Sequence, residues 1–330
     1  QTRGMKNNIL LPFILIFFAS CDYPLFTAQK AEAPEIAVSA FFTADSVLRV
    51  KVEPVVNAFS NSYEMVNIEK VKVIKRNTDQ EFLLQSESDS SGVYTLPDLL
   101  PAPGDVLTFE AYVNGYDKPV TATDTVPEGK PDFRLVSTGL TACTHYNFDD
   151  NVSLKPSAVF RFMPNRMRRV SYYEFLDDIT EYGAGGAYYY SDAEKVYLAT
   201  TSSLITAEDY YPSNPVVDEL GPLSLLFKCK DITDSVTIDF SYYTGLFGDF
   251  DSLYTSNHDL RIELREVSYS YYKYKTTYYC QKYAIDGNYI YGMPAPVAVY
   301  SNLENGAGIF AAYNSLSTTY YVKAKGVRPQ

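Results

Sequence analysis

Apolar and polar residues alternate with a period of two along much of the chain, and this pattern restricts the fold more than any other feature. Leu48, Val50 and Val52 alternate with charged residues, and similar alternation recurs at 107–113 and 260–265. Successive side chains of a β-strand point to opposite faces, so these segments predict strands with one buried and one solvated face. The chain is therefore expected to be mainly β.

Turn-forming clusters divide the predicted strands into two groups. Short strands fill residues 35–127, which is typical of an immunoglobulin-like or transthyretin-like β-sandwich. Residues 127–131 begin and end with proline and predict a hinge, and a second mainly-β domain is expected over residues 132–330. Within that domain Ser268 is placed to cap one short helix near 269–283.

Residues 5–20 have the composition of an export signal. The start is weakly basic, residues 9–18 are almost entirely apolar, and two small residues precede Cys21. A membrane-spanning helix needs about 20 apolar residues and a signal only about 7–15, so the shorter run favours a signal. The small residues before a cysteine further indicate a lipoprotein signal, with Cys21 as the lipidated first residue and 21–34 as a tether. An ordinary or uncleaved signal is the alternative.

The acidity of the chain excludes one class of partner. The 330 residues have a net charge of −12 and a pI near 4.7. A surface that binds a nucleic-acid backbone needs clustered lysine and arginine, so we expect no nucleic-acid partner. An acidic chain is not attracted to an anionic membrane face either, and lipid would have to provide the anchor.

Few residues offer catalytic chemistry. The two histidines are His145 and His258; we interpret His258 as a solvated turn residue, and no third group supports a Cys143–His145 pair. Asp249 and Asp251 are the clustered acids that a hydrolase could use, although a turn explains them as well. No cysteine pair has metal-ligand spacing. We therefore predict no catalytic residue, metal ligand or cofactor.

The three cysteines after Cys21 allow at most one internal disulfide, so the chain is not a disulfide scaffold. One oxidised pair would suit an exported protein. Any two of Cys143, Cys229 and Cys280 could form it, and the sequence leaves the choice open.

Tyrosine is unusually frequent, with 31 Tyr against 19 Phe and no Trp. Tyrosine suits half-buried strands and binding surfaces alike, because its ring packs while its hydroxyl reaches water. The glycine-rich stretch that starts at Tyr182 has no P-loop lysine and does not predict phosphate binding. Tyr182, Tyr188, Tyr189 and Tyr190 are instead candidates for a binding surface, with a hairpin of packed tyrosines as the alternative.

Two blocks in the C-terminal third, residues 260–274 and 294–313, are distinctive. The second block contains the motif residues Asn302, Gly306, Gly308 and Phe310. Together the blocks resemble the Bacteroidota lipoprotein family known as domain of unknown function 4249. Glycines at these positions fit a tight turn that leads into a strand, where a side chain would clash, so we interpret the motif as structural.

This resemblance implies an outer-membrane lipoprotein that accompanies a TonB-dependent transporter of the starch-utilisation type. The family has no established catalytic residues, so none is transferred to this chain. Asp22, directly after the cysteine, favours the cell surface over the periplasmic face. We therefore expect a lipid-anchored accessory binding or assembly component of a transporter. The alternatives are an envelope hydrolase that uses clustered carboxylates and a purely structural or adhesive surface protein.

Overall fold

The computed structural model describes residues 36–44, 46–55, 67–88, 92–97, 99–144, 152–183, 186–190, 224–232, 234–242, 257–291 and 298–323. Its elements, in chain order, are β1 (Ile36–Thr43), β2 (Leu48–Pro54), β3 (Ile68–Lys75), β4 (Gln80–Leu83), β5 (Gln85–Ser86), β6 (Val93–Leu96), β7 (Val106–Val113), β8 (Val120–Thr125), β9 (Phe133–Thr144), β10 (Val152–Phe162), β11 (Val170–Gly183), β12 (Gly186–Tyr190), β13 (Leu225–Lys230), β14 (Val236–Ser241), β15 (His258–Val267), α2 (Tyr269–Tyr291) and β16 (Ala307–Val322). The predicted mainly-β fold with a helix in its C-terminal part is confirmed.

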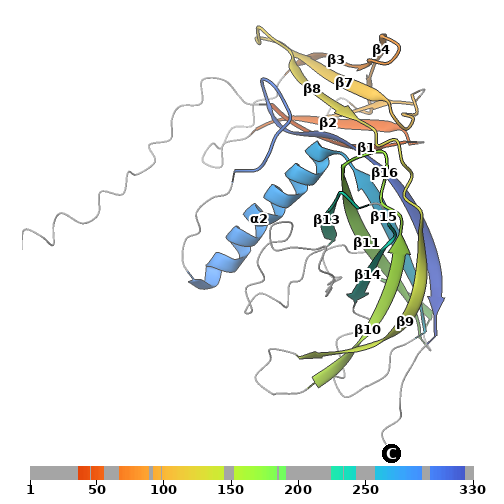
Figure 1. Ribbon diagram of the computed structural model, residues 1–330. Coiled ribbons are helices and arrows are strands. Elements are labelled where there is room, and N and C mark those ends of the chain that lie inside the picture. Colours follow the sequence, from red (N-terminus) through yellow and green to blue (C-terminus); the bar gives the residue numbers. More distant parts are fainter. Residues whose placement is uncertain are drawn as a thin grey trace, which may run out of the picture.

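One long sheet extends through the whole molecule (Figure 1). Its strand order is β12-β11-β15-β16-β1-β2-β6-β5, and β13 also pairs with β11. At its centre β16 pairs in parallel with β1, from Ala37 opposite Ala307 to Thr43 opposite Tyr313. The last of the described strands thus lies beside the first. Strands from both sides of the predicted hinge at 127–131 belong to this one sheet.

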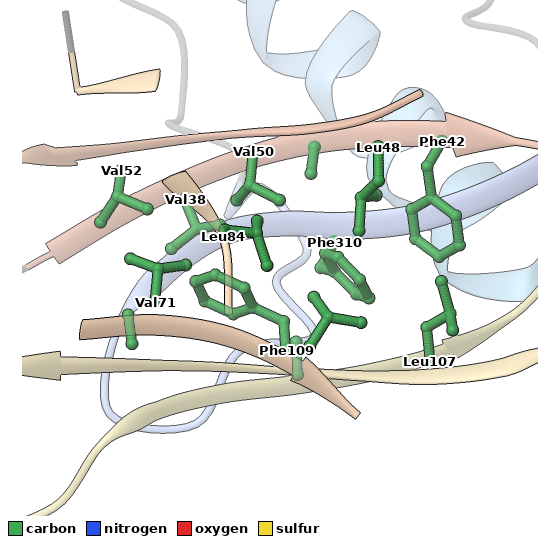
Figure 2. Close-up of a cluster of buried hydrophobic side chains, with 14 of the residues drawn as sticks. Val38, Phe42, Leu48, Val50, Val52, Val71, Leu84, Leu107, Phe109 and Phe310 are labelled. Atoms are coloured by element: carbon green, nitrogen blue, oxygen red, sulfur yellow. The ribbon is translucent and has the colours of Figure 1, made fainter. Parts of the chain in front are cut away.

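The first core lies between the long sheet and a four-stranded sheet of order β4-β3-β7-β8. Figure 2 shows that its apolar side chains come from β1, β2, β3, β7 and β16. The ring of Phe310 is 4.5 Å from that of Phe42 and 5.6 Å from that of Phe109, centroid to centroid. The C-terminal strand therefore supplies a central ring to the N-terminal core.

The second core lies between the other half of the long sheet and a three-stranded sheet of order β14-β10-β9. Phe160 of β10 stacks on Phe175 of β11 with a centroid distance of 4.6 Å. Leu260, Ile262 and Leu264 of β15 point into this core and are fully buried, as their period-two alternation predicts.

Helix α2 covers the opposite face of the long sheet (Figure 1). On β16, Phe310 and Ala312 face the first core, whereas Ile309 and Ala311 pack toward the helix. The sequence predicted a short helix that ends near residue 283, but α2 continues to Tyr291. A single interior glycine costs a helix only about 1 kcal/mol, and the next proline is at position 294, so the helix has no strong stop before that point.

Candidate functional site

The face of the long sheet beneath α2 carries a cluster of polar contacts. The helix begins where Ser268 caps it: the amide of Tyr271 donates to the Ser268 hydroxyl at 3.1 Å. The same hydroxyl donates to Asp124 of β8 at 2.5 Å, and the amide of Ala312 also donates to Asp124, at 2.8 Å. The start of α2 is thereby fixed to both β8 and β16. Burial raises the pKa of Asp124 to about 6.

Glu174 of β11 is the centre of this cluster and is completely buried. Its carboxylate accepts hydrogen bonds from the Ser224 hydroxyl at 2.8 Å, from Arg265 Nη1 at 3.2 Å and from the Tyr271 hydroxyl. Lys275 Nζ lies 3.9 Å from Glu174 Oε1. Burial alone would raise the pKa of Glu174, but Lys275 and Arg265 outweigh it, so the pKa lies below its ordinary value. Glu174 is therefore a charged, fully partnered carboxylate.

Arg265 of β15 connects Glu174 to the rest of the network. Its Nε donates to Glu263 at 2.7 Å and its Nη1 donates to the Tyr271 hydroxyl at 3.0 Å. The guanidinium carbon lies 4.6 Å from the ring centroid of Tyr313. A planar guanidinium can make these contacts together, since its donors spread in one plane and its faces stack on rings. This arrangement links α2 and β16 to β11 and β15, and it commits the Glu174 carboxylate to hydrogen bonds with Ser224, Arg265 and Tyr271.

The sequence analysis did not single out Glu174 or Arg265 as site residues. For Arg265 the reason is that strand alternation predicted a solvated face. Glu174 gave one usable signal: it is an acid between two bulky aromatic residues, Tyr173 and Phe175. Arg265 and Glu263 of β15 belong to a partly buried hydrogen-bond network because α2 packs on the face of the sheet that carries them, and the sequence does not show this packing.

Helix α2 presents tyrosines to solvent in its first turn and farther along its length. Tyr269 is 50% exposed and Tyr278 is 41% exposed. The ring of Tyr274 stacks parallel to that of Tyr278, with centroids 5.9 Å apart, and Tyr300 approaches Tyr269 edge-on. These residues form two ring pairs, Tyr269 with Tyr300 and Tyr274 with Tyr278, on different sides of α2, because the positions from Tyr269 to Tyr278 span about two and a half helical turns. We call the two pairs together the tyrosine surface. Exposed, ordered tyrosines of this kind are enriched at protein interfaces.

The interpretation of His258 as a solvated turn residue is wrong. His258 is the first residue of β15 and is fully buried, and its Nε2 shares a 2.9 Å hydrogen bond with the Tyr242 hydroxyl. The preceding polar residues suggested a turn, but the strand begins at the histidine itself, on the face that the three-stranded sheet covers.

Asp177 of β11 is an acid inside the second core. It lies between Phe175 and Ile179 on the buried face, and neither of its carboxylate oxygens has a hydrogen-bond partner among the described residues. Burial, and then the charge of Asp178, raises the pKa of Asp177 to about 8. A carboxylate without a partner is costly in such a place, so Asp177 is a neutral acid at neutral pH.

The motif residues of the C-terminal block direct β16 into the sheet. Asn302 donates from Nδ2 to the carbonyl of Phe310 at 2.7 Å and accepts from its amide at 3.0 Å. Gly308 has a φ of +107°, and a Cβ there would overlap the carbonyl oxygen of Val38 on β1. A Cβ on Gly306 would lie 2.8 Å from a methyl of Val120. The motif thus permits close parallel pairing of β16 with β1.

The remaining candidates from the sequence are the tyrosines at 182–190 and four residues with proposed chemical roles. The tyrosine-rich stretch forms a β-hairpin in which Tyr182 of β11 pairs with Ala187 of β12, and Tyr188, Tyr189 and Tyr190 continue β12. Their side chains are outside the described part of the structure. Cys21, His145, Asp249 and Asp251 also lie outside the described residues.

Two of the three candidate disulfide cysteines are described in full. Cys229 is a buried free thiol in the second core, and Cys280 is a partly exposed free thiol on α2. The backbone of Cys143 lies on β9. Burial raises the pKa of the Cys229 thiol to about 12, so it remains protonated at neutral pH.

The described residues contain no group of three or more histidine, cysteine or acidic side chains arranged to hold a metal ion. In the same part of the chain, no helix has the length and apolar character needed to cross a bilayer.

Comparison with known proteins places the chain in a family. A search of curated proteins finds no relative. The family model described as Domain of unknown function (DUF4249) matches residues 23–319, which include both cores, helix α2 and the motif from Asn302 to Phe310. The chain therefore belongs to the DUF4249 family.

Proposed function

We propose that this protein is a lipoprotein of the Bacteroidota cell envelope, anchored through Cys21 to the outer membrane and displayed at the cell surface. In that position it acts as an accessory binding or assembly component of a TonB-dependent nutrient transporter. The signal-like segment that ends at Cys21 supports the anchor, and membership of the DUF4249 family agrees with it.

The tyrosine surface of α2 is the observation that favours a binding role. It combines two tyrosines, Tyr269 and Tyr278, that are 50% and 41% exposed with the parallel stacking of Tyr274 on Tyr278. Large, ordered aromatic side chains contribute much of the binding energy at interfaces at a small cost in conformational entropy. The face beneath the helix is fixed by the Glu174–Arg265 network, which gives the surface a rigid base.

The hydrolase alternative has less support. Glu174 is committed to Ser224, Tyr271 and Arg265, and Asp177 is closed inside the second core. Asp249 and Asp251, the acids named for that alternative, lie outside the described residues. No observation on the described part of the chain favours hydrolysis over binding.

Co-purification from the native envelope tests the proposal. Membranes carrying a tagged full-length chain are extracted with mild detergent, and the bound proteins are identified by mass spectrometry. We expect a TonB-dependent transporter to be recovered with the native chain. Cys21→Ala should release the protein from the membrane fraction, and labelling with a radioactive fatty acid should be lost in that variant.

A matched pair of variants separates the tyrosine surface from general exposure of aromatic residues. Tyr269→Ala combined with Tyr278→Ala should reduce transporter recovery, whereas Tyr321→Ala, at a residue 58% exposed on β16, should not. Recovery of a soluble partner in place of a transporter would contradict the proposed role. Equal recovery with all variants would exclude the tyrosine surface as the contact.

A further inference from the structure

The ammonium group of Lys275 lies among three aromatic rings and a carboxylate. Its Nζ is 5.4 Å from the ring centroid of Phe41, 5.8 Å from that of Tyr271 and 5.6 Å from that of Tyr279. Glu174 Oε1 is 3.9 Å from the same nitrogen. Rings within about 6 Å of a cation attract it through their quadrupoles, so these groups form a cation-binding arrangement. We call the four residues around Lys275 the ammonium cage.

The walls of the cage are held in place by contacts that do not involve Lys275. Glu174 accepts hydrogen bonds from Ser224 and Arg265, and the Tyr271 hydroxyl is fixed by Arg265 at 3.0 Å. The ring of Phe41 packs edge-on against that of Tyr271, with centroids 5.0 Å apart. The cage would therefore keep its shape if the lysine left it.

Lys275 itself is held less tightly than the walls. Its distance of 3.9 Å from Glu174 exceeds the roughly 2.7–2.9 Å of a charge-assisted hydrogen bond. The Lys275 side chain is 23% exposed, whereas the Glu174 side chain is fully buried, so the lysine occupies the open end of the cage. Removal of Lys275 would still leave Glu174 paired with Arg265, which avoids an isolated buried charge.

We propose that the ammonium cage of Phe41, Tyr271, Tyr279 and Glu174 is a binding site for alkylammonium groups. Lys275 is its internal occupant, and an ammonium group from a binding partner can take its place. A displaced Lys275 would regain hydration and rotamer freedom, which offsets part of the loss of its cage contacts. This site does not depend on the lipid anchor or on the transporter, and it stands if either of those is disproved.

Competition by tetramethylammonium chloride tests the site in the unmodified full-length chain. Tetramethylammonium binds aromatic cages and cannot consume an amine-reactive reagent. The protein is treated with a limiting amount of an acetylating N-hydroxysuccinimide ester across a titration of this salt, and acetylation at each lysine is measured by mass spectrometry. We expect acetylation of Lys275 to rise saturably, by about threefold or more, as its ammonium is displaced.

Two internal comparisons make the result specific. Lys273 is two positions before Lys275 on α2, and its Nζ lies 5.9 Å from the ring centroid of Tyr269, outside the cage, so its acetylation should stay constant. Sodium chloride at the same ionic strength should leave Lys275 unchanged, because a strongly hydrated cation gains little from the rings. A flat response at Lys275, an equal response to sodium chloride, or a parallel rise at Lys273 would each overturn the proposal.

Phe41→Leu removes one aromatic ring of the ammonium cage and leaves no large cavity in a hydrophobic core. Phe41 is 37% exposed, so the variant is expected to fold, and circular dichroism verifies this. The tetramethylammonium concentration at half-maximal effect should then rise by about two- to fivefold, the contribution of one cation–π contact. An unchanged midpoint in the folded variant would show that the rings do not form the site.

Discussion

Asp177, the neutral acid in the second core, should make the free energy of unfolding depend on pH. Replacing a buried polar residue usually lowers the stability of a protein, but here we expect the opposite at alkaline pH. Asp177→Asn replaces a titratable group by one of nearly the same shape that stays uncharged. In the part of the chain that the structure describes, neither carboxylate oxygen of Asp177 has a hydrogen-bond partner, so the substitution breaks no hydrogen bond there. We therefore expect the variant to be more stable than the native chain at alkaline pH and about equally stable in mild acid.

The magnitude follows from the change in pKa. The folded chain keeps the Asp177 proton up to about pH 8, whereas an ordinary aspartate releases it near 3.8. Between these values the folded state binds the extra proton, so the free energy of unfolding falls as the pH rises, by about 1.4 kcal/mol per pH unit. From pH 5 to pH 8 the native chain should lose about 3–4 kcal/mol that the variant keeps.

Urea unfolding of both proteins, followed by circular dichroism at pH values from about 5 to 8, measures this difference. Other groups with raised pKa values, such as Asp124 and Glu266, have the same effect in both chains and cancel in the comparison. Glu87→Gln, at an exposed residue paired with Arg49, makes the same carboxyl-to-amide change outside the cores and serves as the control. A stability difference that does not vary with pH, or a variant less stable than the native chain at pH 8, would refute the reasoning.

Three further predictions concern the long sheet and its helix. Gly308→Ala should lower the free energy of unfolding by about 2–4 kcal/mol in chemical denaturation, because its Cβ would meet the neighbouring backbone at a positive φ. Ser268→Ala should lower it by about 1–2 kcal/mol, since the helix loses its cap and its bond to Asp124; hydrogen exchange should show faster opening confined to the first turn of α2. Arg265→Met should cost about 3–5 kcal/mol by leaving Glu174 poorly compensated, and the double change with Glu174→Leu should recover part of that loss in thermal unfolding.

Local sequence patterns were sufficient for the character of the strands. Leu260, Ile262 and Leu264 alternate with charged residues, and the structure buries all three on one face. Ser268 was expected to start a helix and does so, because a cap acts through bonds within one turn. Such features depend on neighbours close in sequence, and a sequence displays those neighbours directly.

Which element covers each face of a strand was decided by the tertiary structure alone. Arg265 alternates like a solvated residue, yet α2 covers it, and His258 follows a polar turn, yet the second core encloses it. The pairing of β16 with β1 joins residues about 270 positions apart, which no local period can encode. Period-two alternation specifies that a strand has two different faces, but which element covers each face depends on how distant strands pair.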